Sequence, residues 1–125
     1  ASPNTVVAMK RYRGLTLRIL GRRSPAMGPG RAQLITQIER TGSISAAARA
    51  MGMSYRRAWQ LVEALNRSFS RPVVTKAVGG KRGGGAVVTD FGKRMVALYH
   101  AMESKASSAI ATDVRRFSRH LRRSR

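Results

Sequence analysis

The sequence predicts a mainly α-helical domain with one small β-hairpin, and three features of the 125-residue chain lead to this fold class. Residues 42–66 contain two helical patterns separated by a glycine. Residues 73–78 and 86–89 are β-prone runs on either side of a glycine-rich segment. From residue 90 onward, apolar side chains recur at alternating intervals of four and three, the spacing of a long helix with one packing face.

The first thirty residues are predicted to be mostly irregular. Residues 1–14 are interpreted as a flexible basic arm, since basic side chains cluster there without a hydrophobic period. Leu15, Leu17 and Ile19 then alternate with polar residues, which predicts a half-buried strand. Residues 21–30 are predicted to form a loop because Gly and Pro recur in them.

Three helices are expected next. The first covers residues 31–40 and packs behind the other two. Its apolar stripe consists of Leu34, Ile35 and Ile38. Ser45 is the predicted N-cap of the second helix, whose alanines allow another helix to approach closely. Gly52 is a suitable stop residue for that helix, and Ser54 is the predicted N-cap of the third.

Two helices joined by a tight glycine turn form a helix-turn-helix, whose second helix lies in the major groove of DNA. Because Ala58, Val62 and Leu65 are predicted to face the core, Arg56 and Gln60 point outwards. Arg can bind guanine and Gln can bind adenine, while Ser and Tyr hold phosphate. The predicted DNA-binding residues of this unit are Ser45, Ser54, Tyr55, Arg56, Arg57 and Gln60. The alternative is an ordinary helical hairpin with solvated charges.

Trp59 lies about 100° from the centre of the predicted buried face of this helix. Two interpretations are open, half-buried packing and contact with the DNA backbone, and we favour packing.

The two β-prone runs predict a hairpin whose tip is a wing. A glycine-rich tip lets the backbone approach sugar and phosphate closely, and Lys81 and Arg82 supply positive charge there. These two residues are therefore predicted to bind DNA.

The final long helix is predicted to start at Thr89 or Asp90. Phe91 and Met95 are expected to pack on the domain itself. Beyond them, the helix is predicted to pair with a second copy of the chain. The predicted dimerisation residues are Leu98, Met102 and Ala109.

The chain is accordingly divided into a basic arm (residues 1–14), a winged domain with the dimerisation helix (residues 15–111) and an Arg-rich tail (residues 112–125). Val114, Phe117 and Leu121 share one side of the tail, which is compatible with a basic amphipathic helix. Extra phosphate contact is the favoured role. An anionic membrane surface and the partner subunit are the alternatives.

Composition narrows the function. The net charge of +20, from 25 basic against five acidic residues, favours a polyanionic partner, and double-stranded DNA is the first candidate. The chain has no Cys, and its two histidines, His100 and His120, lie far apart in sequence and lack close carboxylate partners. No catalytic set, metal site, cofactor or small-molecule ligand is therefore predicted. Without a membrane span or signal peptide in the sequence, we expect a soluble, cytoplasmic, nucleoid-associated protein. Because no catalytic set is predicted, we do not expect it to be an enzyme.

The segments TGSISAAARAMGMSYRRAWQLVEALN and GGKRGGGAVVTDFGKRMVALY resemble the N-terminal winged-helix domain of the molybdate-responsive ModE regulators. More distantly, they resemble the DNA-binding domain of LysR-type regulators. The resemblance covers residues 15–102 and implies a homodimer that places two recognition helices on a palindromic operator. It does not extend to the molybdate-binding part of ModE, so molybdate sensing is not carried over.

Three functions compete. The leading one is a sequence-specific, dimeric transcriptional regulator. The second is a nucleoid-type architectural protein that coats DNA with little base preference, which the charge and the tail favour. The third is the DNA-binding part of a ligand-sensing, oxyanion-responsive regulator.

Overall fold

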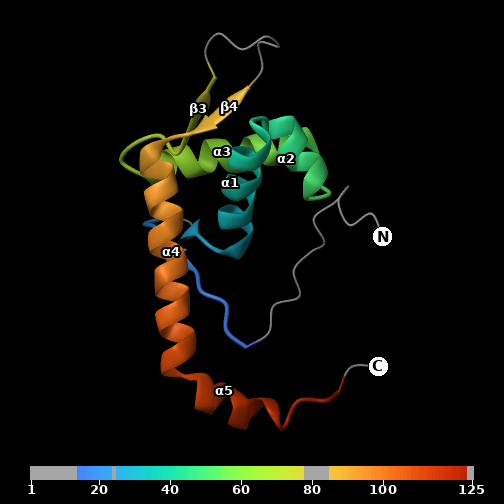
Figure 1. Cartoon of the computed structure of the whole chain (residues 1–125), viewed down its shortest axis with the longest axis vertical. Helices are drawn as coiled ribbons and strands as arrows, with labels where there is room; N and C mark the ends of the chain where they lie inside the picture. The colour runs from blue at the N-terminus through green and yellow to red at the C-terminus, as the bar shows by residue number, and fades with distance from the viewer. Residues whose placement is uncertain (1–13, 24, 78–84, 124–125) are drawn as a thin grey trace.

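The computed structural model describes residues 14–23, 25–77 and 85–123 (Figure 1). The elements in chain order are β1 (Ile19–Leu20), β2 (Pro25–Met27), α1 (Pro29–Thr41), α2 (Ile44–Ala50), α3 (Tyr55–Ser68), β3 (Val74–Lys76), β4 (Ala86–Val88), α4 (Asp90–Ala109) and α5 (Ala111–Ser118). The helices α1, α2 and α3 form one unit, the hairpin β3–β4 rises above it, and α4 runs past it to α5 (Figure 1). The predicted mainly helical class with a hairpin is confirmed.

The ends of α1 follow from Pro and Gly. Pro29 occupies the first helical turn, where the N–H that it lacks would have no partner within the helix. Gly42 adopts a φ of 72° and donates its N–H to the carbonyl of Ile38 at 2.8 Å. Gly tolerates this left-handed conformation without steric cost, so the chain reverses here and enters α2.

Serine side chains start both helices of the helix-turn-helix, but one of them is not the predicted residue. The hydroxyl of Ser43 accepts a hydrogen bond from the Ala46 N–H at 3.0 Å and caps α2. The prediction that Ser45 caps α2 is wrong, because Ser43 has the extended backbone of an N-cap whereas Ser45 lies inside the helix. Ser54 is confirmed as the N-cap of α3, accepting from the Arg57 N–H at 3.0 Å.

The core lies where α1, α2 and α3 meet. The predicted stripes of α1 and α3 are confirmed as buried, and they comprise Leu34, Ile35 and Ile38 with Ala58, Val62 and Leu65. Ala47 and Ala48 of α2 are also buried, and their small side chains let α2 approach both neighbours. Gly52 turns between α2 and α3 with a φ of 69°, as predicted. This packing leaves the opposite side of α3 in solvent.

The hairpin β3–β4 is antiparallel, and the predicted pair of strands is confirmed. Asn66 of α3 anchors it, because its amide donates to the Val74 carbonyl at 2.9 Å and accepts from the N–H groups of Val73 and Val74. The N–H of Ala86 also donates to the carbonyl of Gly42 at 2.9 Å. The hairpin is thus fixed to both α3 and the end of α1. The predicted wing residues Lys81 and Arg82 lie outside the described residues.

The segment before α1 differs from its prediction. The predicted alternation holds, since Leu15, Leu17 and Ile19 are partly buried while the residues between them are exposed. The strand β1, however, contains only Ile19–Leu20, and it pairs with Pro25–Met27 in the stretch that was predicted to be a loop. Ala26 and Met27 are buried, so this hairpin is fixed by the core although its sequence looks irregular. Of the predicted basic arm, the structure describes only Gly14.

The helix α4 begins after Thr89, whose hydroxyl accepts from the Gly92 N–H at 2.9 Å. Phe91 and Met95 pack against the core, as predicted. Tyr99 does so as well, with 1% of its surface exposed and its hydroxyl donating to the Leu17 carbonyl at 2.7 Å. The sequence prediction missed Tyr99, which fixes the first segment of the chain along α4.

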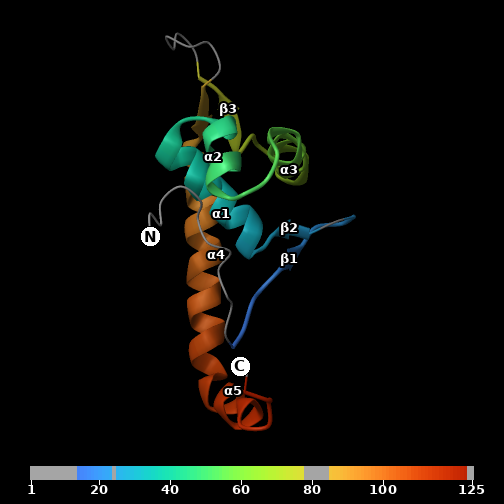
Figure 2. The ribbon, with the colours of Figure 1, turned by 90° about the vertical axis from the view of Figure 1, so that its right-hand side faces the viewer.

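The chain turns after Ala109 into α5, which lies across the end of α4 far from the hairpin β3–β4 (Figures 1 and 2). Val114 is partly buried, and its Cγ1 lies 3.5 Å from the position that a Cβ on Gly14 would occupy. Among the described residues, no helix combines the length and apolar character that a membrane crossing requires.

Candidate nucleic-acid interface

The predicted recognition residues lie together on the solvent side of α3. Ser54, Tyr55, Arg56, Arg57 and Gln60 are all exposed. They occupy the N-cap and the first two turns, and the first turn contains no acidic residue. Positive and hydrogen-bonding groups therefore gather at the end of α3 that in a helix-turn-helix contacts base edges.

Trp59 lies beside this surface and is 45% exposed. It does not belong to the core cluster or to the partly buried side chains packed on it. Rather more than half of its surface is nevertheless covered, so the choice between half-buried packing, which we favour, and contact with the DNA backbone stays a prediction. Its indole is accessible to a partner along α3.

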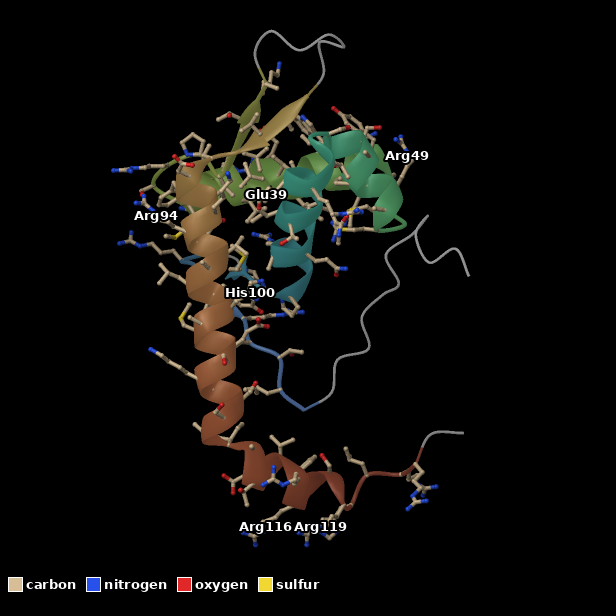
Figure 3. All side chains as sticks on the ribbon, viewed as in Figure 1. Glu39, Arg49, Arg94, His100, Arg116 and Arg119 are labelled. Atoms are coloured by element: carbon tan, nitrogen blue, oxygen red, sulfur yellow. The ribbon has the colours of Figure 1, made fainter. Side chains whose placement is uncertain are left out.

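Ser45, which was also predicted to bind DNA, lies in the first turn of α2. Its hydroxyl accepts a hydrogen bond from Nη1 of Arg49 at 3.2 Å. Arg49 extends into solvent from α2 (Figure 3). Because the first helix of a helix-turn-helix crosses the DNA backbone, Arg49 belongs to the candidate interface. The sequence prediction missed it, although its position four residues after Ser45 places both on one helix face.

A second arginine stands behind the start of α3. Arg31 of α1 donates from Nη1 to the Pro25 carbonyl at 2.7 Å and so joins α1 to β2. Burial lowers the pKa of the Arg31 guanidinium, and the positive charge of Arg57 lowers that pKa further. The two cations are therefore close enough to repel each other. An anion bound near Arg57 would relieve this repulsion.

The acidic residues of the chain do not neutralise the positive charge at the start of α3. The chain has five carboxylates. Three of them lie in the pairs Glu39–Lys93 (3.7 Å), Glu63–Arg67 (3.9 Å) and Glu103–His100 (2.8 Å). Asp90 and Asp113 lie in the first turns of α4 and α5, where negative charge stabilises a helix N-terminus. The start of α3 therefore retains its positive charge for a partner.

His100 has a close carboxylate partner, contrary to the prediction. His100 was predicted to lack a close carboxylate partner, but its Nδ1 lies 2.8 Å from Oε1 of Glu103, one turn further along α4 (Figure 3). The described residues contain no group of three or more His, Cys, Asp or Glu side chains that could hold a metal ion.

Two further surfaces of the described structure carry predicted roles. Leu98 and Met102 on α4 are 55% and 40% exposed, and Ala109 is exposed as well. Two arginines, Arg116 of α5 and Arg119 at its C-cap, point away from the rest of the molecule (Figure 3). The whole length of α4 separates these arginines from the hairpin β3–β4 (Figure 3).

A helix-turn-helix followed by a two-stranded hairpin, with an exposed, basic second helix, defines a winged helix-turn-helix DNA-binding protein. The chain belongs to the bacterial regulatory helix-turn-helix proteins of the LysR family, which residues 30–93 match. Its helix-turn-helix is therefore the one that characterises this family of bacterial regulatory proteins.

The chain is also similar to individual proteins along most of its length. Over 94 residues the chain is 47% identical to the molybdenum-pterin-binding protein MopB of Rhodobacter capsulatus, covering 75% of this chain and 35% of MopB. It is 40% identical over 85 residues to the molybdenum transport protein ModE of Azotobacter vinelandii, covering 68% and 32%. It is 38% identical over 88 residues to the DNA-binding transcriptional dual regulator ModE of Escherichia coli K12, covering 68% and 34%. The chain spans about a third of the length of these relatives.

Among solved structures, the chain is similar to the full-length LTTR LysG from Corynebacterium glutamicum. The TM-score is 0.51 and the sequence identity 24%, covering 74% of this chain and 30% of LysG. At this identity the likeness concerns the fold alone.

Proposed function

We propose that the protein acts in the cytoplasm as a homodimeric transcriptional regulator on a palindromic DNA operator and carries out no catalysis. The observation that carries this proposal is the solvent side of α3, where Arg56 and Gln60 stand at the capped start of a helix whose opposite side is buried. Rigid packing behind a helix is what allows its side chains to read base edges with fixed geometry.

Each side chain of this surface has a suitable partner on DNA. The guanidinium of Arg56 matches the O6 and N7 acceptors of guanine, and the amide of Gln60 matches N6 and N7 of adenine. Tyr55 and Arg57 suit phosphates. The hydroxyls of Ser54 and Ser45 accept intramolecular hydrogen bonds, which leaves their protons for phosphate oxygens.

The wing adds a contact beside the recognition helix. The hairpin β3–β4 is held to α3 by Asn66, so its position relative to the recognition helix is set. Lys81 and Arg82, at the predicted tip of this hairpin, are assigned to the DNA backbone or the minor groove.

Dimerisation is assigned to the outer side of α4. Leu98 and Met102 form an exposed apolar pair near the middle of the helix, whose bounds are Asp90–Ala109. A two-fold axis perpendicular to α4 at this level pairs the same residues of both copies and makes the helices antiparallel. Because α4 spans about 30 Å, the two helix-turn-helix units then lie near opposite ends of the pair. That separation is close to the approximately 34 Å between successive major grooves.

The arginines of α5 favour a second candidate function. They lie at the end of α4 remote from the hairpin β3–β4, so one protomer presents two separated basic surfaces (Figure 3). An architectural protein uses such surfaces to hold two DNA segments together. We rank this function second, since it assigns no task to the arrangement of Arg56 and Gln60.

The experiment is selection of DNA by the purified protein at about 0.15 M salt, where loose phosphate binding is weakened. A specific regulator enriches a shared inverted repeat and prefers it over random DNA by about 1,000-fold or more. An architectural protein recovers fragments from the whole genome evenly, and that result would overturn the proposed regulator.

On the selected site, Arg56→Ala and Gln60→Ala should each cost about 1–3 kcal/mol of binding free energy and relax the preference at one base pair. The matched control for Arg56→Ala is Arg116→Ala on α5, which also removes one positive charge but should leave the base preference unchanged (Figure 3). Binding of both α3 variants with wild-type affinity and preference would exclude this face as the reading surface.

A further inference from the structure

A groove lies between the turn that joins β1 to β2 and the C-terminal half of α3. Its volume is about 450 Å³, and its lining residues are Gly21, Arg22, Arg23, Ala64, Arg67 and Ser68. Figure 2 views α3 nearly end-on, with the hairpin β3–β4 on one side of it and the hairpin β1–β2 on the other. The groove therefore flanks the recognition helix on the side away from the wing.

The groove is strongly basic. Three of its six lining residues are arginines, and none is acidic. Outside the lining, Oε1 of Glu63 lies 3.9 Å from Nη1 of Arg67, whose side chain is 72% exposed. An ion pair this long and this exposed is weak and screened by salt, so it leaves Arg67 available.

The floor of the groove adds no competing charge. Ala64 contributes only a methyl group, and the hydroxyl of Ser68 donates to the Ala64 carbonyl at 2.8 Å. Among the side chains of the lining, the hydrogen-bond donors left for a ligand are therefore the guanidinium groups. Their planar forks match the oxygens of a phosphate.

The groove is also aligned with the reading surface. Arg67 follows Arg56 by eleven residues, so the two lie within about 20° on α3 and about 16 Å apart along its axis. Gln60 lies between them on the same side of the helix. A DNA strand that follows this side of α3 beyond its reading residues meets the groove.

We propose that Arg22, Arg23 and Arg67 bind a phosphate of the DNA backbone in this groove, so that β1–β2 acts as a second clamp opposite the wing. This inference rests on the proposed function, since it needs α3 to face DNA. A free oxyanion has the same chemistry, but the arginines of the turn are exposed and the groove is open. A phosphate that is held in place by the rest of a DNA duplex needs no enclosure.

The test compares the variant Arg22→Gln/Arg23→Gln with the wild type on the selected operator and on random DNA. The variant should bind both about ten-fold or more weakly, with the ratio between them unchanged. The slope of log K against log salt should become shallower by up to about 0.9, as expected when one phosphate is no longer neutralised. Arg22→Lys/Arg23→Lys keeps the charge and should recover most of the slope.

The contact is localised by methylphosphonate substitution, which removes the charge of one phosphate at a time. One position should weaken the wild type about ten-fold and leave Arg22→Gln/Arg23→Gln unaffected, because this variant does not bind that phosphate. The control Arg116→Gln/Arg119→Gln removes the same charge on α5 and its C-cap and should still respond to that position. If both double variants respond equally at every position, the groove does not bind the backbone.

The remaining outcomes separate the two proposals. If the wild type shows no preferred DNA sequence, the proposed function fails before the groove is tested. If the wild type prefers one DNA sequence, and Arg22→Gln/Arg23→Gln keeps wild-type affinity and salt slope, only the proposed phosphate contact in the groove is refuted.

Inorganic phosphate is titrated into the free protein as a second probe. If phosphate binds the wild type tightly, does not bind the double variant and does not compete with DNA, the groove is instead a site for a free oxyanion.

Discussion

At the scale of single residues, Gly92 determines how closely α4 approaches Val73, the residue that precedes the strand β3. A Cβ at this position would lie 2.5 Å from the carbonyl oxygen of Val73 and 2.9 Å from its Cγ1. That carbonyl also accepts hydrogen bonds from the N–H and the hydroxyl of Thr89. The contact therefore links the start of α4 to the hairpin β3–β4, and the main chain of Val73 has little freedom to yield.

We expect Gly92→Ala to lower the free energy of unfolding by about 1–3 kcal/mol, the usual cost of overpacking. The chain offers a matched control in Gly30→Ala, because a Cβ on Gly30 has no neighbour within 4 Å. Gly30 also lies in a helix, so Ala there should raise the free energy of unfolding by about 0.5–1 kcal/mol. Urea unfolding of both variants measures the difference, and a Gly92→Ala protein as stable as Gly30→Ala would contradict the close contact.

At the scale of elements, the exposed side of α4 yields a prediction about assembly. Leu98→Glu places a charge at the centre of the proposed dimer interface, where no partner neutralises it. The variant should sediment as a monomer at concentrations at which the wild type is a dimer. Ser104→Glu adds the same charge on an exposed position about 120° around the helix and should leave the dimer intact. Equal sedimentation of the two variants would place the interface elsewhere.

The same helix shows why sequence patterns predict elements better than contacts. The spacing of Phe91, Met95, Leu98 and Met102 indicated the helix correctly, but Tyr99 and Glu103 lie on a neighbouring stripe with an equally regular period. Which stripe faces inwards depends on the carbonyl of Leu17, 82 residues away from Tyr99, and no local pattern reveals it.

The helix-turn-helix itself was predictable because its signals are local. The buried stripe of α3, the cap at Ser54 and the turn at Gly52 are each decided within a few residues. Ser43 and Ser45 are chemically identical, so only the backbone conformation identifies the cap. The groove beside Arg67 was not predictable, since it requires the hairpin β1–β2, which the core positions through Met27.

At the scale of the whole molecule, the position of α5 bears on what the Arg-rich tail does. In an antiparallel pair of α4 helices, α5 of one protomer lies at the same end as the hairpin β3–β4 of its partner. Deleting residues 115–125 should therefore weaken binding to all DNA sequences alike and lower the salt slope by about 0.9 for each phosphate that the tail neutralises. Base preference should not change, in contrast to Arg56→Ala. A salt titration of both proteins decides this, and an unchanged slope would mean that the tail does not touch phosphate.

The last prediction concerns the spacing of the two half-sites. A dimer joined through the middle of α4 holds its recognition helices about 30 Å apart, so both face the same side of the duplex one turn apart. Inserting five base pairs between the half-sites rotates one of them to the opposite side, since a turn is about 10–10.5 base pairs. Inserting ten restores the side but adds about 34 Å, more than the pair of α4 helices can span. Both insertions should therefore reduce affinity to that of a single half-site, as measured by gel shift. Tolerance of the ten-base-pair insertion alone would indicate a flexible connection between the protomers, and tolerance of both would indicate that each protomer binds independently, as in an architectural protein.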